Sequence, residues 1–249
     1  MVLSGKTALV TGASRGLGRA MALAISKSGA AIALVARHTE KLNGVRQEIE
    51  SAGGSAKVFI ADVTQEDQVS RLKDEVGAQM GRVQILINSA GINIRKNLTE
   101  FSLEEWRSVL DANLTSVFLM CRAFVPDMQG TGYGRIINLS SMMSHISLPG
   151  RSAYSASKAA LLGLTKALAL ELAGEGVTVN GISPGPFATE LNQVLLNNPE
   201  ANAQFLANLP VGRWGKPEEI GALADYLCSE SAGFITGTDI LIDGGWTAR

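Results

Sequence analysis

A tyrosine and a lysine four positions apart, Tyr154 and Lys158, form the pair with the clearest chemical potential in this sequence. On a helix, positions i and i+4 lie on one face, one turn apart. A nearby ammonium charge favours the phenolate, which lowers the pKa of a tyrosine from its free value of about 10. Such a pair could serve as a general acid or base on an alcohol or a carbonyl. Because this spacing also arises by chance on exposed helices, the surrounding elements must decide its meaning.

A glycine-rich loop near the N-terminus has the features of a phosphate site. Residues Thr7–Thr11 (TALVT) predict a buried strand, and Gly12-Ala-Ser-Arg-Gly16-Leu-Gly18 and a helical pattern follow at once. Glycines let the backbone approach phosphate groups, and the N-terminus of a helix attracts negative charge. The G-x-x-x-G-x-G spacing differs from the more common G-x-G-x-x-G, and a simple tight turn is the alternative. The order strand, loop, helix predicts a site for a dinucleotide pyrophosphate.

The end of the second predicted strand, Ala30–Ala36, bears on which dinucleotide binds. An acidic residue at this point would bind the ribose hydroxyls of NAD. The sequence instead has Arg37 there, and Arg15 lies in the glycine loop. Two arginines without a carboxylate favour the 2′-phosphate of NADP(H). The alternative is that both are solvated surface residues and that the cofactor is NAD(H).

Apolar strands and amphipathic helices alternate through nearly all of the 249 residues. Further strands are predicted at 56–61, 83–87, 134–140, 177–182 and 238–242, and helices at 39–52, 64–81, 102–110, 113–125, 152–172 and from Pro217 onward. This alternation predicts an α/β Rossmann fold, a seven-stranded doubly wound parallel sheet with helices on both faces. Because no linker interrupts the pattern, residues 1–249 are predicted to form a single domain.

Local signals mark helix starts and one insertion. Ser102 and Glu105 form a predicted capping box, and Thr64 with Asp67 resembles an N-cap. Residues 187–210 (FATELNQVLLNNPEANAQFLANLP) follow the sixth strand and predict one or two short helices. Ligands of open α/β sheets bind at the carboxyl ends of the strands, so this segment is a candidate substrate lid. The alternative is packing for stability or for a subunit contact.

The composition excludes several classes of function. Hydrophobic residues make up 46% and charged residues 18%, the net charge is −1, and no basic block suggests nucleic-acid binding. No apolar run reaches the length of a membrane span, and no leader is recognisable, so we expect no membrane association and a cytoplasmic protein. Cys121 and Cys228 are predicted to be buried thiols. His38 and His145 form no ligand cluster with them, so we expect no metal site.

These motifs appear together in one order along the chain: Thr11-Gly12-x-x-x-Gly16-x-Gly18, Asp62, Asn88-x-Ala90-Gly91, Asn113, Ser141, Tyr154-x-x-x-Lys158 and Pro184-Gly185. In this combination the sequence resembles the classical short-chain dehydrogenase/reductase family over essentially its full length. One departure is that the family's usual Asn-Asn-Ala-Gly reads Asn88-Ser89-Ala90-Gly91 here. A serine can still form local hydrogen bonds, so the departure does not argue against activity.

The resemblance implies a role for each catalytic residue. Tyr154 would exchange the proton of the substrate oxygen, and Lys158 would lower its pKa and hold the nicotinamide ribose. Ser141 would hydrogen-bond the substrate oxygen and stabilise the developing charge. Asn113 would hold a water molecule that connects Lys158 to solvent.

The resemblance also implies which residues bind cofactor and substrate. The cofactor-binding candidates are Gly12, Ser14, Arg15, Gly16, Leu17, Gly18, Arg37, Asp62, Val63, Asn88, Gly91, Tyr154, Lys158, Pro184, Gly185, Phe187 and Thr189. The substrate-binding candidates are Arg95, Ser141, Met143, His145, Tyr154 and Leu191. Arg95 could anchor a carboxylate, and the alternative for it is a solvated arginine.

Two readings within the family compete for the substrate. One is a dehydrogenase of a small polyol, sugar acid or related hydroxy/keto compound, and the C-terminal residues 212–215 and 237–248 look similar to gluconate 5-dehydrogenase-like members. The other is a 3-oxoacyl-[acyl-carrier-protein] reductase, whose acidic partner would need basic residues at the entrance. Residues 127–134 contain no base, and residues 171–176 carry two acids, which favours the small substrate.

Two further expectations complete the sequence reading. A non-catalytic NADP-binding regulator is the alternative of another class, but it would be expected to lack one of the four catalytic residues. Members of the family are usually homotetramers. Residues 152–172 are apolar around much of the predicted helix, which is typical of a helix that buries more than one face. We therefore expect a homotetramer that binds a small-molecule substrate.

Overall fold

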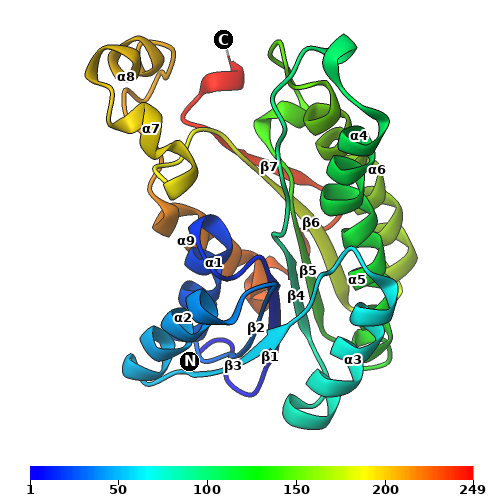
Figure 1. The fold of residues 1–249 in the computed structure, drawn as a ribbon. Helices are drawn as coiled ribbons and strands as arrows, with labels where there is room; N and C mark the ends of the chain where they lie inside the picture. Colours follow the sequence, from blue (N-terminus) through cyan, green and yellow to red (C-terminus); the bar gives the residue numbers. More distant parts are fainter. Residues whose placement is uncertain (249) are drawn as a thin grey trace.

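A seven-stranded parallel sheet forms the centre of the computed structural model, which describes residues 1–248, apart from the side chains of Leu191 and Val194 (Figure 1). The strand order is β3-β2-β1-β4-β5-β6-β7. The strands are β1 (Thr7–Thr11), β2 (Ala31–Ala36), β3 (Ser55–Ile60), β4 (Ile85–Asn88), β5 (Gly134–Leu139), β6 (Val177–Pro184) and β7 (Asp239–Ile242). The order reverses between β1 and β4, which is where open α/β sheets bind ligands.

Helices cover both faces of the sheet, as Figure 1 shows. On one face lie α1 (Gly16–Lys27), α2 (Thr39–Ser51) and α9 (Pro217–Cys228), and on the other lie α3 (Glu66–Met80), α4 (Leu103–Leu110), α5 (Ser116–Met128) and α6 (Ser152–Leu172). Two apolar cores result, one on each face. β1, β4, β5 and β6 are buried along their whole length, and each carries Val, Ile or Leu residues that pack into these cores. The predicted doubly wound fold is confirmed.

Most predicted elements lie where the pattern put them. The helix α6 covers residues 152–172 as predicted, and Pro217 occupies the first turn of α9. Ser102 caps α4 through a hydrogen bond from the amide of Glu105, whose carboxylate accepts from the Ser102 amide. The segment 187–210 contains two short helices, α7 (Gln193–Leu196) and α8 (Pro199–Leu206). Cys121 and Cys228 are buried and free.

The predicted cap at Thr64 is wrong. The helix α3 begins at Glu66, with Gln65 as its N-cap residue and no side-chain cap hydrogen bond. The Thr64 hydroxyl instead donates to Oδ1 of Asp62 at 2.7 Å, and the Thr64 amide donates to the same atom at 3.0 Å. A short turn around the Asp62 carboxylate therefore takes the threonine out of the capping position.

One continuous helical stretch joins α4 and α5. Residues Leu103–Met128 are long and apolar enough to cross a membrane by length and composition, a test that core helices also pass. Val117, Met120 and Phe124 from this stretch are buried in the core between α5 and the sheet. The stretch contains a π-helical turn, Asp111–Thr115, and such turns often occur at functional sites.

Candidate active site

Thr11, at the carboxyl end of β1, joins the glycine loop to the loop after β4. Its hydroxyl accepts hydrogen bonds from the amides of Ser89 (3.0 Å) and Ala90 (3.1 Å). A Cβ on Gly12 would lie 3.0 Å from the Cα of Ala90, and Gly12 has a φ of 64°. Both the contact and the left-handed conformation require glycine at this position. The two loops therefore form one backbone-lined surface at the carboxyl edge of the sheet.

The start of α1 has the geometry of a dinucleotide phosphate site. A Cβ on Gly18 would lie 2.4 Å from the carbonyl oxygen of Gly12, so no larger residue fits there. The N-cap residue, Arg15, provides no side-chain cap hydrogen bond, which leaves the first amides of α1 available to an anion. Thr189 lies across from this turn, because a Cβ on Gly16 would be 3.9 Å from its Cγ2. The predicted cradle thus fits a pyrophosphate.

The residues proposed for the adenosine end lie after the neighbouring strands β2 and β3. Arg37 follows β2 and is exposed, as is Arg15 in the glycine loop. Among the described residues, neither arginine takes part in an ion pair. Asp62 and Val63 follow β3, and Val63 is buried. Two unpaired arginines at this edge suit a phosphate on the ribose.

Asn88 ends β4 with an acceptor that no protein group satisfies. Its Nδ2 donates to Oδ1 of Asn138 at 3.0 Å, and Nδ2 of Asn138 donates to Oγ1 of Thr165 at 2.9 Å. This chain fixes the orientation of the amide, and the buried Oδ1 of Asn88 has no partner within the described structure. A buried acceptor without a donor is costly. Its position beside the glycine loop fits a polar ligand group.

Asn113 lies in the π-helical turn and is fully buried. Its Oδ1 accepts from the amide of Ile92 at 2.8 Å, and its Nδ2 donates to the carbonyl of Ile92 (2.9 Å) and to Oγ of Ser157 (3.0 Å). A Cβ on Gly91 would lie 2.8 Å from this Oδ1 and 3.6 Å from Nζ of Lys158. Asn113 therefore fixes the loop after β4 against α6, close to the lysine. Its predicted water molecule remains a prediction.

Ser141 and Tyr154 meet at the carboxyl end of β5 and the first turn of α6. Ser141 is buried, and its Oγ accepts from the amide of Met143 at 3.1 Å. Burial raises the pKa of Tyr154, while a hydrogen bond with Ser141 and the positive charge of Arg151 act in the opposite direction. The net shift is upward, so the phenol is protonated at neutral pH.

Lys158 is buried beside the ring of Tyr154. Its Nζ donates to the carbonyl of Leu139 at 2.6 Å and lies 5.9 Å from the centre of the Tyr154 ring. Only 5% of the residue is exposed, and burial lowers its pKa to about 8. The expectation that Lys158 lowers the pKa of Tyr154 remains a prediction. Burial destabilises the ammonium as well as the phenolate, and it is the dominant effect on both.

The remaining cofactor candidates follow β6 at the same edge. Gly185 lies so close to β7 that a Cβ on it would be 2.5 Å from the Cα of Asp243. Phe187 is buried and forms an isolated bridge with Gly215. The other candidates, Ser14, Leu17 and Pro184, lie in the glycine loop, the first turn of α1 and the end of β6. The structure thus brings the predicted cofactor residues to one edge of the sheet.

The substrate candidates are placed less closely together. Nε2 of His145 lies 2.7 Å from Oδ2 of Asp239, an oxygen that also accepts from Oγ of Ser183 at 2.6 Å. Met143 is buried and Arg95 is exposed. The side chain of Leu191 lies outside the described residues. These substrate contacts remain predictions.

Sequence reasoning missed three features of the site. Arg151 precedes α6 and acts on Tyr154, and Asp239 links β7 to the loop after Ser141. In addition, the Phe205 ring of α8 stacks on Trp214 at 4.7 Å and contacts Trp246 at 5.1 Å. This aromatic contact fastens the candidate lid to the C-terminal tail. In the sequence, only the presence of these aromatic residues could have indicated the contact.

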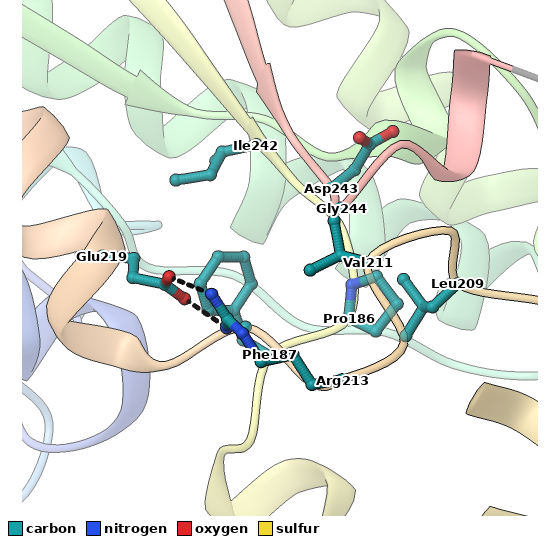
Figure 2. Close-up of a pocket in the computed structure, with 10 residues that line it drawn as sticks. Pro186, Phe187, Leu209, Val211, Arg213, Glu219, Ile242, Asp243 and Gly244 are labelled. Carbon is teal, nitrogen blue, oxygen red and sulfur yellow. Dashed lines mark hydrogen bonds and ion pairs between the residues drawn. The ribbon is translucent and has the colours of Figure 1, made fainter. Parts of the chain in front are cut away.

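A cavity of about 190 Å³ lies between the segments 186–187, 209–215 and 242–244, beside Glu219 of α9 (Figure 2). Its wall includes Phe187 and Val211, and the ion pair between Arg213 and Glu219 borders it. Ser141, Tyr154 and Lys158 do not line it. Within residues 1–248, no three His, Cys, Asp or Glu side chains are grouped to hold a metal ion.

The chain is similar to known oxidoreductases along its whole length. A family model described as Enoyl-(Acyl carrier protein) reductase matches residues 12–247. Gluconate 5-dehydrogenase of Gluconobacter oxydans is 37% identical over 98% of this chain and 96% of its own. The 3-oxoacyl-[acyl-carrier-protein] reductase of Haemophilus influenzae is 36% identical over 98% of both chains.

Solved structures give the same result. A short-chain type dehydrogenase/reductase from Mycobacterium marinum has a TM-score of 0.93 and 42% identity, over 99% of this chain and 97% of that one. A gluconate 5-dehydrogenase from Burkholderia cenocepacia, in complex with NADP and tartrate, has a TM-score of 0.94 and 34% identity, with the same coverage of 99% and 97%. With the geometry of its site, these similarities show that the chain belongs to the classical short-chain dehydrogenase/reductase family and is an oxidoreductase of CH–OH groups.

Proposed function

We propose that this oxidoreductase transfers a hydride between NADP(H) and a secondary alcohol or ketone of a small polyol, sugar acid or related hydroxy/keto compound. The observation that carries the proposal is the position of Ser141, Tyr154 and Lys158. All three lie at the carboxyl edge of the sheet, beside a glycine loop whose open helix N-terminus suits a pyrophosphate.

Each catalytic residue of the site has its own role in the proposed reaction. The bound nicotinamide supplies or accepts the hydride. Tyr154, whose pKa is raised, is protonated at neutral pH and gives its proton to the ketone oxygen during reduction. Ser141 donates a hydrogen bond to the same oxygen and stabilises the charge that develops on it. Lys158, with a pKa of about 8, holds the ribose and exchanges protons through the water expected at Asn113.

Three observations support NADP(H) as the cofactor, with NAD(H) as the alternative. Arg15 and Arg37 are exposed and unpaired among the described residues, and no carboxylate follows β2. The Burkholderia cenocepacia relative was solved with NADP. The orphan acceptor of Asn88 and the uncapped amides at the start of α1 fit a dinucleotide in the predicted position.

The runner-up is a 3-oxoacyl-[acyl-carrier-protein] reductase, to which the chain is also similar. The acidic segments that weighed against a carrier protein in the sequence precede β5 and β6, so they lie at the amino edge of the sheet, opposite the site. There the amide of Gly130 donates to the Glu175 carboxylate at 2.9 Å. Their charge therefore gives no information about the entrance to the site. Measured activity on substrates has to distinguish a dehydrogenase of small hydroxy/keto compounds from a 3-oxoacyl-[acyl-carrier-protein] reductase.

Further parts of the proposal concern the lid and the assembly. Residues 187–210 are proposed to cover the substrate, with Phe205 fastening them to the tail. We propose a cytoplasmic location from the sequence alone, and a homotetramer is supported by apolar side chains that face outward on α5, α6 and the edge strand β7. Phe118 is 46% exposed, Leu170 82% and Leu241 39%. A monomer mass in light scattering would refute the proposed homotetramer.

A substrate panel followed by nicotinamide absorbance, with both cofactors, tests the function. Wild-type protein should turn over a hydroxy or keto compound, and Tyr154→Phe should bind NADPH without turnover. Tyr226→Phe on the exposed side of α9 is the matched control and should retain activity. Retained turnover in Tyr154→Phe would refute the mechanism. Wild-type protein that binds NADPH but turns over nothing in the panel would favour the non-catalytic regulator.

A further inference from the structure

Two arginines flank a backbone hydrogen bond at the entrance to the site. The amide of Lys96, in the loop after β4, donates to the carbonyl of Gly150 at 3.3 Å. Arg95 precedes the donor residue, and Arg151 follows the acceptor residue. The bond therefore brings the segments that carry the two arginines together. Arg151 is the N-cap residue of α6, and Tyr154 lies three positions later, one helical turn away.

The two guanidinium groups and the tyrosine influence one another. Burial lowers the pKa of Arg151, the positive charge of Arg95 lowers it further, and Tyr154 raises it. The charge of Arg151 in turn lowers the pKa of Tyr154. Together with the backbone bond between Lys96 and Gly150, these effects indicate that Arg151 lies near both the segment of Arg95 and Tyr154.

Neither arginine has an acidic partner in the described part of the chain. No ion pair includes Arg95 or Arg151, whereas the adjacent Lys96 is paired with Glu105. The other nearby carboxylate, that of Glu100, accepts from the amide of Asn97. The local acids are thus engaged elsewhere. Two close cations without a counter-charge disfavour the folded state, a conflict that is typical of ligand sites.

We propose that Arg95 and Arg151 together bind the carboxylate of the substrate, so that the protein prefers an anionic hydroxy or keto acid to a neutral polyol. The inference rests on the proposed function and selects the sugar acid from its substrate classes. Guanidinium groups bind carboxylates through paired hydrogen bonds, and Arg is less hydrated than Lys. A carboxylate held one helical turn from Tyr154 leaves a neighbouring hydroxyl carbon within reach of the phenol.

The test compares matched anionic and neutral substrates. Aldonates of four to six carbons and alditols of the same lengths are oxidised with NADP⁺ by wild-type protein, Arg95→Gln and Arg151→Gln. Wild-type protein should prefer each aldonate, by kcat/KM, roughly tenfold or more over its alditol. Each variant should lose on the order of 10- to 100-fold more in kcat/KM on aldonates than on alditols, mainly through KM. Added salt should reduce the preference for aldonates.

Two control variants separate the pair from general charge effects. Arg82→Gln removes an exposed arginine just before β4, at the opposite edge of the sheet, and should change neither substrate class. Arg151→Lys keeps the charge without the planar fork and should recover part of the aldonate activity. Equal losses on aldonates and alditols, or a wild-type preference for alditols, would overturn the proposal.

A binding measurement distinguishes failure of this proposal from failure of the proposed function. If wild-type protein oxidises neither class but reduces a 3-oxoacyl thioester, the proposed substrate range is wrong. Calorimetric titration of the NADP⁺-loaded protein with D-gluconate then tests the arginines directly. Binding by wild-type protein that Arg151→Gln abolishes would support the anion site. Absence of binding to wild-type protein, or equal binding by the variant, would refute it.

Discussion

Lys158 offers the sharpest test of the electrostatics in the site. Burial lowers its pKa from 10.5 to about 8, so the charged ammonium destabilises the folded protein. A shift of this size corresponds to about 3 kcal/mol. Below pH 8 the lysine is protonated in both states, and this cost reduces the free energy of unfolding in full. Above pH 10.5 it is neutral in both states and the cost vanishes, so stability from this source rises with pH between the two values.

The substitution Lys158→Met removes the charge and retains an unbranched side chain. It also removes the hydrogen bond to the carbonyl of Leu139, and an unsatisfied carbonyl costs about 1–3 kcal/mol. At pH 7 the free energy lost with this hydrogen bond nearly equals the free energy gained because no ammonium is buried. Wild type and variant should therefore have similar free energies of unfolding. At pH 10 wild type should be more stable than the variant by about 2 kcal/mol. The variant should have no turnover at any pH.

Urea unfolding followed by tryptophan fluorescence at pH 7, 8, 9 and 10 measures this difference. Other titrating groups are common to both proteins, so their contributions cancel in it. Lys166→Met provides the matched control, because Lys166 lies two turns further along α6 and is exposed. Its difference from wild type should stay constant with pH. A constant difference for Lys158→Met as well would refute the burial argument.

Three other substitutions test separate parts of the site. Arg37→Asp should weaken NADPH binding on the order of 10- to 100-fold and leave NADH binding equal or better; an unchanged NADPH affinity in a fluorescence titration would contradict the phosphate role. Phe205→Ala should shift tryptophan emission and raise KM on the order of tenfold, whereas an unchanged KM would exclude the lid. Asp239→Ala should cost about 2 kcal/mol in urea, since His145 and Ser183 lose their acceptor; a cost near zero would show that the contact is weak.

The sequence predicted the fold well because its strands are buried on both faces. β1, β4, β5 and β6 lie in the middle of the sheet, and the Val, Ile and Leu residues in each of them indicate buried strands. The helix α6 was predicted to the residue, because its apolar pattern stops where the chain turns toward β6. The cap at Thr64 failed because two local patterns compete there, and the carboxylate of Asp62 engages the hydroxyl.

What the sequence could not predict depends on contacts between distant segments. His145 and Asp239 are separated by 94 positions, and no local pattern relates them. The proposed role of Arg151 depends on Arg95, which lies in the loop after β4. The pKa directions of Tyr154 and Lys158 follow from burial, which their four-residue spacing does not reveal. The spacing pointed to this pair, but only the structure shows that burial raises the pKa of the Tyr154 phenol.

The distribution of charge gives these observations a common cause. The net charge is only −1, yet four arginines at the carboxyl edge, Arg15, Arg37, Arg95 and Arg151, have no acidic partner within residues 1–248. Other arginines of that range also lack an acidic partner, among them the exposed Arg82 and the buried Arg135, whose guanidinium donates to the carbonyl oxygens of Ser229 and Gly176. The four at the carboxyl edge differ from these two in that they lie where the ligands are proposed to bind. A site that accommodates an anionic cofactor at one end and an anionic substrate at the other would leave these positive charges for its ligands to neutralise.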